Sequence, residues 1–311
     1  MNVFEKIYCR AVQTVFHVAL PVLPYREPRI LGGVSEIADV LEEKGIARAM
    51  LVTDAGLRSA GLTRPLEELL EKRGIATVVY DKTRANPTVA NVEEARKAYL
   101  YGRCECLIAV GGGSSMDCAK ALGARIAYPK KELYKLKGTL RVLRRIPPLF
   151  AVPTTAGTGS EVTLAAVITD GERKHKYTMN DFALIPRYAV LDPEMTYSLP
   201  PSLTATTGMD ALTHAVEAYI GRSTTRHTRR MATQAVRLVH DNLLDAYRNG
   251  GDERARTAMM EAAYKAGVAF TQSYVGYVHA IAHSLGGQYG TPHGLANAVI
   301  LEASVVCVTR G

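Results

Sequence analysis

The sequence predicts an α/β N-terminal domain built on a parallel sheet, followed by an all-helical C-terminal domain. From Arg48 onward, short β-branched runs alternate with helical periodicity, as in a parallel sheet wrapped by helices. Beyond Leu203 the strand pattern stops and long helical periodicities follow. A double proline at 200–201 marks the change, so we expect one domain over residues 1–198 and a second over residues 199–311.

Individual elements follow from the same patterns. In the first domain, strands are expected at 50–54, 76–80, 107–110, 149–152, 165–169 and 189–191, with helices around 66–70, 92–101 and 115–126. In the second domain, helices are expected over 209–219, 229–247 and 257–270.

The bulk composition is that of a globular protein. The chain has 311 residues, of which 47% are hydrophobic, which is enough for two domains with a core each. The apolar stretch 11–23 contains Gln13, His17 and Pro21, so it is too short and too polar to span a membrane. It also lacks the charged start and small-residue cleavage site of a secretory signal. We therefore expect a cytoplasmic protein without a membrane partner.

The cysteines and the net charge exclude two classes of site. No two cysteines have the C-x-x-C spacing of metal ribbons and redox pairs, so buried free thiols are expected at Cys9, Cys104, Cys106, Cys118 and Cys307. The formal charge of +8 is densest over 130–145, where Tyr134 is the one aromatic among the basic residues. A nucleic-acid groove would interleave more aromatics, so this stretch is interpreted as a solvated helical face and no nucleic-acid partner is expected.

A run of glycines lies where an expected strand passes into an expected helix. Gly111, Gly112 and Gly113 let backbone amides approach a phosphate, and the helix N-terminus adds partial positive charge. Ser114 and Asp117 have capping-box spacing, which supports a helix start there. The alternative is a simple tight turn without a ligand.

Asp54 favours a dinucleotide at this loop. An acidic residue that closes the first strand of such a sheet can accept hydrogen bonds from an adenosine ribose, and it repels a 2′-phosphate. NAD is therefore favoured over NADP. An ordinary helix N-cap is the alternative interpretation of Asp54.

A second loop, at 153–161, consists of small and hydroxylic residues and directly follows another expected strand. The hydroxyl groups of Thr154, Thr155, Thr158 and Ser160 could bind phosphate, ribose or amide groups. A featureless surface loop could share this composition. Two such loops after separate strands of one sheet favour a ligand cleft.

Two pairs of residues at helical i,i+4 spacing predict a metal site. Asp210 and His214 share one helix face, and His279 and His283 repeat the spacing. His293 follows in a Thr-Pro-His-Gly turn, where Pro292 can start a helix. One carboxylate with imidazoles suits Fe(II) or Zn(II). Spacing alone decides neither between the two metals nor between His279 and His283 as a ligand.

Taken together, these motifs resemble the iron-containing (group III) alcohol dehydrogenases, which share a dehydroquinate synthase-like fold, and the similarity covers essentially the whole chain. The resemblance implies a metal held by Asp210, His214, His279 and His293, with Fe(II) expected and Zn(II) as the alternative. It also implies that His283 transfers protons near the nicotinamide of NAD.

The same resemblance implies which residues bind NAD. The glycine loop would hold the pyrophosphate, and the second loop would line the cofactor cleft. Lys176 would lie near the ribose, with Lys174 as a competitor for that position. The expected cofactor-binding set is Asp54, Gly111, Gly112, Gly113, Ser114, Asp117, Thr154, Thr155, Thr158, Ser160, Thr163 and Lys176.

By resemblance, the expected activity is an NAD-linked interconversion of a small primary alcohol or diol and its aldehyde, in a homodimer or higher homo-oligomer. A glycerol dehydrogenase-type polyol oxidoreductase and a non-catalytic assembly module derived from this fold are the alternatives. Relatives that act on phosphorylated polyols typically use a partly glutamate-based metal set, which this sequence lacks. Family members continue through several more helices, so the helical domain is expected to be truncated at Gly311.

Overall fold

The computed structural model describes residues 7, 10–11, 14–15, 25–173 and 175–309, and the side chains of 305–309 are not part of that description. The chain divides into two compact units. The α/β unit comprises Glu27–Thr155 and Ser160–Leu199. The helical unit includes Pro200–Gly311 and the short segment Ala156–Gly159.

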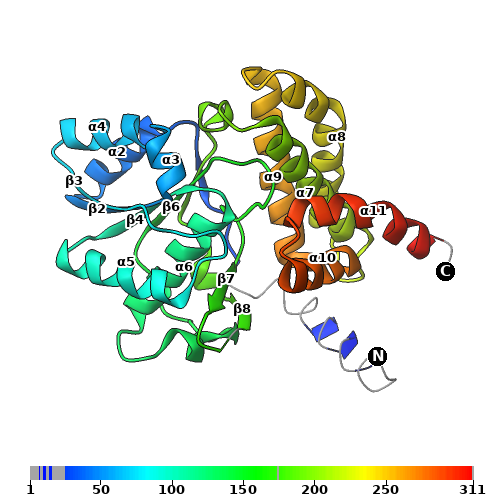
Figure 1. Cartoon of the computed structure of the whole chain (residues 1–311), viewed down its shortest axis with the longest axis horizontal. Coiled ribbons are helices and arrows are strands. Elements are labelled where there is room, and N and C mark those ends of the chain that lie inside the picture. The colour runs from blue at the N-terminus through cyan, green and yellow to red at the C-terminus, as the bar shows by residue number, and fades with distance from the viewer. Residues whose placement is uncertain (1–6, 8–9, 12–13, 16–24, 174, 310–311) are drawn as a thin grey trace. The chain divides into compact units, whose positions relative to one another are not determined.

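A six-stranded parallel sheet forms the centre of the α/β unit (Figure 1). Its spatial order is β1-β9-β6-β4-β2-β3, and neighbouring strands pair in parallel throughout. The strands are β1 (Arg29–Leu31), β2 (Arg48–Val52), β3 (Ala76–Tyr80), β4 (Cys106–Gly111), β6 (Leu149–Pro153) and β9 (Tyr188–Val190). The expected α/β fold class is thereby confirmed.

Helices cover both faces of this sheet because its central strands are apolar on both sides. Met50 and Leu107 pack on the side of α5 (Val89–Tyr101) and α6 (Gly113–Ala127). Leu51 and Ile108 point the other way, into a second cluster with α2 (Ser35–Glu43) and α4 (Arg64–Lys72). The one-turn α3 (Ala55–Ser59) follows β2, and the 3-10 helices η3 (Phe182–Leu184) and η4 (Pro193–Thr196) flank β9.

A smaller sheet follows the order β5-β8-β7, with β7 and β8 antiparallel. Its strands are β5 (Gly138–Thr139), β7 (Ala165–Asp170) and β8 (His175–Asn180). The strand expected at 165–169 is present as β7, but it belongs to this sheet and not to the parallel one. The sequence pattern could not separate the two, because an alternating strand looks alike in either sheet.

The basic stretch 130–145 is not the helical face that was expected. It contains the short 3-10 helix η2 (Leu133–Leu136), the two-residue strand β5 and a loop. Gly138, Leu140 and Leu143 have positive φ angles, which end any regular helix. The buried side chains of Leu133, Leu136 and Val142 hold the stretch against the α/β core, and most of its charges remain exposed.

The helical unit contains α7 (Pro201–Ile220), α8 (Arg226–Arg248), α9 (Glu253–Ser273), α10 (Tyr277–Tyr289) and α11 (His293–Thr309). A reciprocal capping box between Thr225 and Thr228 starts α8. Alanines let α7, α8 and α9 pack closely, through the fully buried Ala215, Ala218, Ala232, Ala235, Ala266 and Ala269. The expected helical domain is confirmed.

The predictions of no membrane span and of buried free thiols can be compared with the structure only in part, because some of the residues concerned lie outside the described ones. Among the described residues, no helix combines the length and apolarity needed to cross a bilayer. Most of the stretch 11–23 lies outside those residues. Cys104, Cys106 and Cys118 are free and buried, as expected, whereas Cys9 and the Cys307 side chain lie outside the description.

Candidate functional site

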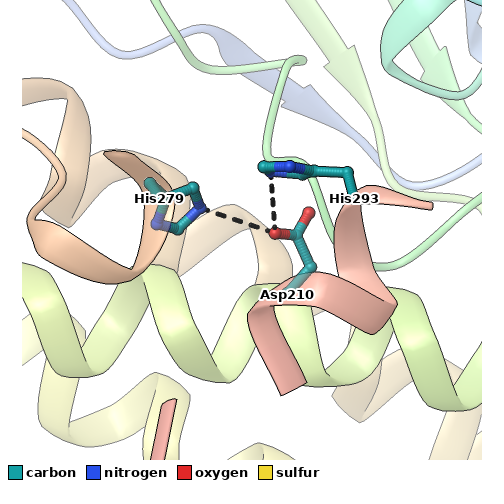
Figure 2. Close-up of side chains that lie close together, drawn as sticks. All are labelled: Asp210, His279 and His293. Atoms are coloured by element: carbon teal, nitrogen blue, oxygen red, sulfur yellow. Dashed lines mark ion pairs between the residues drawn. The ribbon is translucent and has the colours of Figure 1, made fainter. Parts of the chain in front are cut away.

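Three predicted ligands converge in the helical unit (Figure 2). Oδ1 of Asp210, on α7, lies 3.6 Å from Nε2 of His279, on α10, and 3.5 Å from Nε2 of His293, the first residue of α11. These ligand atoms all lie within 4.8 Å of one another. A carboxylate and two imidazoles facing one point are a suitable arrangement for a divalent cation.

Glycine makes this convergence possible. A Cβ atom on Gly294 would collide with the backbone oxygen of Thr206, so α11 can approach α7 only with glycine at that position. His293 is the residue just before this contact and is therefore carried to Asp210. The Pro-His-Gly sequence thus starts the helix and sets its distance from α7.

His214 lies beside this group, one helical turn after Asp210. Its Nδ1 atom is 3.9 Å from Oδ1 of Asp210. The ring is stacked between Phe270 and His279, at centroid distances of 4.1 and 4.3 Å. Burial is the main cause that lowers the pKa of His214 to about 3, so the ring is neutral near pH 7. Within the described part of the chain, the buried Nδ1 has no hydrogen-bond partner.

The charges of the cluster suit a cation. Burial alone would raise the pKa of Asp210, but the attraction of His214 and the hydrogen bond from His279 outweigh it and hold the pKa well below its ordinary range. Burial opposes the charged form of His279, yet its hydrogen bonds to Asp210 and Glu217 raise its pKa to about 9. The site therefore contains a buried negative charge and nitrogen atoms that compete to neutralise it.

The geometry separates His279 from His283, which spacing could not do. His279 is 1% exposed and belongs to the group of converging ligand atoms. His283 is exposed, and its ring centroid lies 4.9 Å from that of His293 and 6.2 Å from that of His279. It therefore lies next to the cluster, at the solvent boundary.

A pocket at the ends of β2 and β4 contains the predicted glycine loop. It is lined by Asp54, Thr83, Arg84, Gly112, Gly113 and Ser114. The chain runs from β2 outward to β3 and then returns to the other side of β2 as β4, so the pocket lies where the strand order reverses. Ligands of open α/β sheets bind at such switch points.

The glycine loop has the backbone that its residues predict. Gly111 ends β4 with a φ angle of +151°, and a Cβ atom there would collide with the side chain of Ser115. Gly112 is the N-cap of α6 and makes no side-chain hydrogen bond, which leaves the first amides of the helix facing the pocket. This arrangement can bind a phosphate anion.

The chain's family follows from comparison with known proteins. A family model described as "Iron-containing alcohol dehydrogenase" matches residues 30–193. One described as "Fe-containing alcohol dehydrogenase family, C-terminal" matches residues 204–309. The chain belongs to the iron-containing alcohol dehydrogenase family. The resemblance inferred from the motifs is thereby confirmed, and the dehydrogenases of this family are oxidoreductases.

Individual members of the iron-containing alcohol dehydrogenase family match most of the chain. "Alcohol dehydrogenase 4" of Saccharomyces cerevisiae is 41% identical over 89% of this chain and 73% of its own length. The "NAD-dependent methanol dehydrogenase" of Bacillus methanolicus is 40% identical over 86% of this chain and 70% of its own. A solved structure of "1,3-propanediol oxidoreductase" has a TM-score of 0.86 and 40% identity, covering 89% of this chain and 73% of that one.

Asp54 has the geometry of a helix N-cap, which was the alternative interpretation of this residue. Its Oδ1 atom accepts a hydrogen bond from the Leu57 amide at 2.9 Å, so it is the N-cap of α3. It also lines the pocket with the glycine loop. The two roles are compatible, because the capping bond uses one carboxylate oxygen.

The prediction of a capping box between Ser114 and Asp117 is wrong. Asp117 does not bond back to the start of α6; it accepts hydrogen bonds from the Ser160 hydroxyl and the Val167 amide. Ser114 instead accepts a hydrogen bond from the Asn86 amide at 3.4 Å. Gly112, not Ser114, is the N-cap, so the spacing that suggested the box was shifted from the true helix start.

Two hydroxyls expected to bind the cofactor have a buried partner within the protein. Lys120, on α6, is fully buried, and its Nζ donates to Oγ of Ser160 at 3.1 Å and to Oγ1 of Thr163 at 3.0 Å. It also donates to the backbone oxygens of Thr163 and Ala165. Burial lowers the pKa of Lys120 to about 8. The sequence analysis did not predict this lysine as a functional residue.

The remaining cofactor-binding expectations fall in different places. Thr154 is buried and its amide donates to the Gly111 oxygen, while Thr155 packs next to Gly112. Thr158 belongs to the segment Ala156–Gly159 of the helical unit. Lys176 donates to Oδ1 of Asn86 at 2.7 Å, and its competitor Lys174 lies outside the described residues.

The sequence analysis missed two residues that contact the group formed by Asp210, His279 and His293. The side-chain Nδ2 of Asn297 lies 2.7 Å from Oδ1 of Asp210 and 3.3 Å from Nε2 of both His279 and His293. Glu217 accepts from Nδ1 of His279 at 2.6 Å. Both carried a helical signal, because Asn297 lies four residues after His293 and Glu217 three residues after His214.

Proposed function

We propose that this protein is a metal-dependent, NAD-linked alcohol dehydrogenase that interconverts a small primary alcohol or diol and its aldehyde. The observation that supports this most strongly is the convergence of Asp210, His279 and His293 on one point. Nδ1 of His214, which has no hydrogen-bond partner among the residues that the structure describes, lies beside them and fits a fourth ligand. The names of the relatives, which include alcohol, methanol and 1,3-propanediol enzymes, support the substrate class.

The donor set fits a divalent cation of borderline softness. One carboxylate and up to three imidazoles suit Fe(II), which the family's name favours, with Zn(II) as the alternative. When bound, such a cation stabilises the negative charge that develops on an alcohol oxygen as it loses its proton. The chain itself supplies the burial of Asp210, which excludes water from that charge and strengthens its attraction for a cation.

His283 is the proposed proton carrier. Its ring lies beside that of His293, and it is exposed, so it can pass a proton between the site and solvent. An imidazole suits this work because it titrates near neutral pH.

NAD is the proposed hydride acceptor. The pocket at the ends of β2 and β4 offers backbone amides of α6 for a pyrophosphate and the Asp54 carboxylate for a ribose. Of the predicted cofactor residues, Gly112, Gly113, Ser114 and Asp54 are supported by this pocket because they line it, and Gly111 directly precedes them at the end of β4. Ser160 and Thr163 are better explained as partners of Lys120. Thr154, Thr155, Thr158 and Lys176 stay proposed contacts.

A cytoplasmic location and a homodimer or higher homo-oligomer complete the proposal. Free buried thiols at Cys104, Cys106 and Cys118 are consistent with a reducing compartment. A glycerol-type polyol oxidoreductase remains the alternative substrate class, and a non-catalytic assembly module the alternative role.

Metal analysis coupled to turnover tests the proposal. The purified full-length protein is analysed for iron and zinc, and NAD reduction is followed at 340 nm with ethanol, 1,3-propanediol and glycerol, before and after Fe(II) or Zn(II) reconstitution. We expect about one metal per chain and metal-restored NAD reduction with a primary alcohol or diol.

The matched variants are His214→Ala and His240→Ala. His240 is an exposed histidine on α8 that pairs with Asp241, away from the cluster. We expect His214→Ala to lose metal and His240→Ala to keep it. Metal uptake that is equal in both variants would contradict His214 as a ligand. A protein that takes up no metal would contradict the site, and glycerol as the preferred substrate would favour the alternative.

A further inference from the structure

A second carboxylate of the helical unit lies directly behind the proposed metal site. Glu217, on α7, is 4% exposed, and its Oε2 atom accepts a hydrogen bond from Nδ1 of His279 at 2.6 Å. The same carboxylate accepts from the amides of Gly276 at 2.7 Å and Val278 at 2.6 Å. Three donors thus fix its position and orientation.

These contacts anchor the start of α10. Gly276 is the N-cap of that helix and has no side chain to bond the first amides. Glu217 supplies the missing acceptor from another helix, and its negative charge is favourable at a helix N-terminus. A Cβ atom on Gly276 would lie 2.8 Å from Oε1, so glycine is needed for the carboxylate to fit.

The bond to His279 also decides which ring nitrogen has the proton. A carboxylate only accepts hydrogen bonds, so Nδ1 must donate to it. In the neutral ring, Nε2 then has a lone pair, and this atom faces Asp210 and His293. Neutral imidazole binds metal through such a lone pair, and a carboxylate behind the ring fixes its tautomer and raises its basicity.

We propose that Glu217 is a positioning residue for the metal site, which holds the ring of His279 with Nε2 directed at the cation. The inference rests on the proposed function, in which His279 is a ligand. Glu217 would not touch the metal, the alcohol or NAD.

Glu217→Gln tests the proposal with little change of shape. Oε2 accepts from both the Gly276 amide and Nδ1 of His279, while Oε1 accepts from the Val278 amide. Glutamine keeps only one of these two acceptor oxygens and has no negative charge. Whichever way its amide lies, the hydrogen bond from His279 is therefore lost or is no longer made to a charged group. Glu261→Gln is the matched control, because Glu261 is a half-exposed residue of α9 that pairs with Lys265.

The first readout is the Nδ1–H proton of His279, which does not need metal. In ¹H–¹⁵N spectra of the chelator-treated full chain, His279 is assigned by comparison with His279→Ala. We expect a strongly downfield Nδ1–H resonance in the unchanged protein and in Glu261→Gln, because this proton is donated to a carboxylate, and an upfield shift or loss of the resonance in Glu217→Gln. An unchanged resonance in Glu217→Gln would overturn the inference, whatever the metal binding.

The second readout is Zn(II) affinity, measured by competition with a chromophoric chelator. We expect Glu217→Gln to bind about 10- to 100-fold more weakly than Glu261→Gln. Equal affinities would overturn the proposed role, even if Glu217→Gln melts at a lower temperature. If the unchanged protein binds no zinc or iron, the proposed function fails, and the Nδ1–H resonance still tests the action of Glu217 on His279.

Gly276→Ala provides a second route if Glu217→Gln does not fold. The added methyl group displaces the Glu217 carboxylate without changing a charge or a ligand. We expect weaker Zn(II) binding and partial loss of the Nδ1 proton signal of His279. Unchanged affinity together with an unchanged Nδ1–H resonance would count against Glu217.

Discussion

The ammonium group of Lys120 lies 3.0 Å from Oγ1 of Thr163, and both residues are buried in the α/β unit. This contact joins α6, which begins with the glycine loop, to the chain that follows the Ala156–Gly159 segment. Its position explains why a charged residue is tolerated there, since oxygen atoms surround the ammonium and the carboxylates of Asp117 and Glu161 lie near enough to stabilise its charge.

Lys120→Ala should therefore destabilise the fold strongly. The change leaves the hydroxyl and backbone oxygens around Lys120 without their donor, and each buried acceptor left unsatisfied costs about 1 to 3 kcal/mol. Urea unfolding followed by circular dichroism measures the loss. Lys130→Ala, at an exposed position, should change the unfolding free energy by less than about 0.5 kcal/mol. Equal stabilities for the two variants would contradict the structural role of Lys120.

Gly111→Ala should weaken both stability and cofactor binding. The φ angle of Gly111 and the closeness of Ser115 leave no room for a Cβ atom, so the loop must shift at a cost of about 1 to 3 kcal/mol. Calorimetric titration with NAD should show weaker binding. Gly171→Ala is the control, because it has open space around it and is expected to behave like the unchanged protein.

Asp54→Asn separates the two roles of Asp54. Asparagine caps a helix about as well as aspartate, so the unfolding free energy should stay within about 0.5 kcal/mol. The charge that repels a 2′-phosphate is lost, so the ratio of kcat/KM for NADP to that for NAD should rise about tenfold, which corresponds to about 1.4 kcal/mol. An unchanged ratio with unchanged stability would leave Asp54 as a helix cap alone.

His283→Ala should slow turnover without removing metal. Loss of a general acid or base typically lowers kcat by about 10²- to 10⁴-fold. Steady-state kinetics over pH 6 to 9, together with metal analysis of the same samples, measures both effects. Added imidazole should restore part of the rate by replacing the missing ring. Loss of metal from this variant would instead indicate that His283 is a ligand.

The three described cysteines should resist alkylation in the folded protein. Burial is the main cause that raises the pKa of Cys104 from 9.0 to about 11, and it also raises those of Cys106 and Cys118. At pH 8 only about one Cys104 in a thousand is then a thiolate. Peptide mapping after iodoacetamide should find these cysteines unlabelled until urea is added.

The raised pKa of Cys104 also makes the free energy of unfolding depend on pH. The folded pKa of Cys104 lies above its unfolded value, so its stabilising contribution is complete below about pH 8.5 and is lost as the pH rises toward 11. The unfolding free energy should thus fall over that range. Cys104→Ser would test the contribution of this thiol, because serine does not ionise there.

Periodicity predicted the long elements well, because one buried face per helix or strand leaves a clear pattern. Strand β3 begins and ends where expected, and α7, α8 and α9 enclose the predicted helices. The three-residue β1 was missed because two of its residues are exposed and it carries almost no pattern. The small sheet was misassigned because pairing between distant segments leaves no local signal.

The candidate site was predictable where a residue type alone restricts the chemistry. Histidine and aspartate at i,i+4 spacing predicted the group in which Asp210, His279 and His293 converge, and glycines predicted the loop that lines the pocket. Hydroxyl-bearing residues predicted cofactor contacts less well, because a hydroxyl can accept a hydrogen bond from a buried lysine as well as bind a ligand. Ser160 and Thr163 both accept from Lys120. Glu217 was missed because a glutamate on a helix is usually solvent-exposed, and only the tertiary packing of α10 against it reveals its role.

Gly157 and Gly159 set a limit on building chimeric enzymes from this chain. A Cβ atom on Gly157 would lie 2.7 Å from the oxygen of Thr207, and one on Gly159 would lie 2.8 Å from the Cα of Gly267. The helical unit is therefore completed by four residues encoded far upstream of Pro200. A gene crossover placed between residues 199 and 200 would combine the segment Ala156–Gly159 of one parent with the helices of another. A chimera that folds must therefore have helices with room for Gly157 and Gly159 at the positions of Thr207 and Gly267.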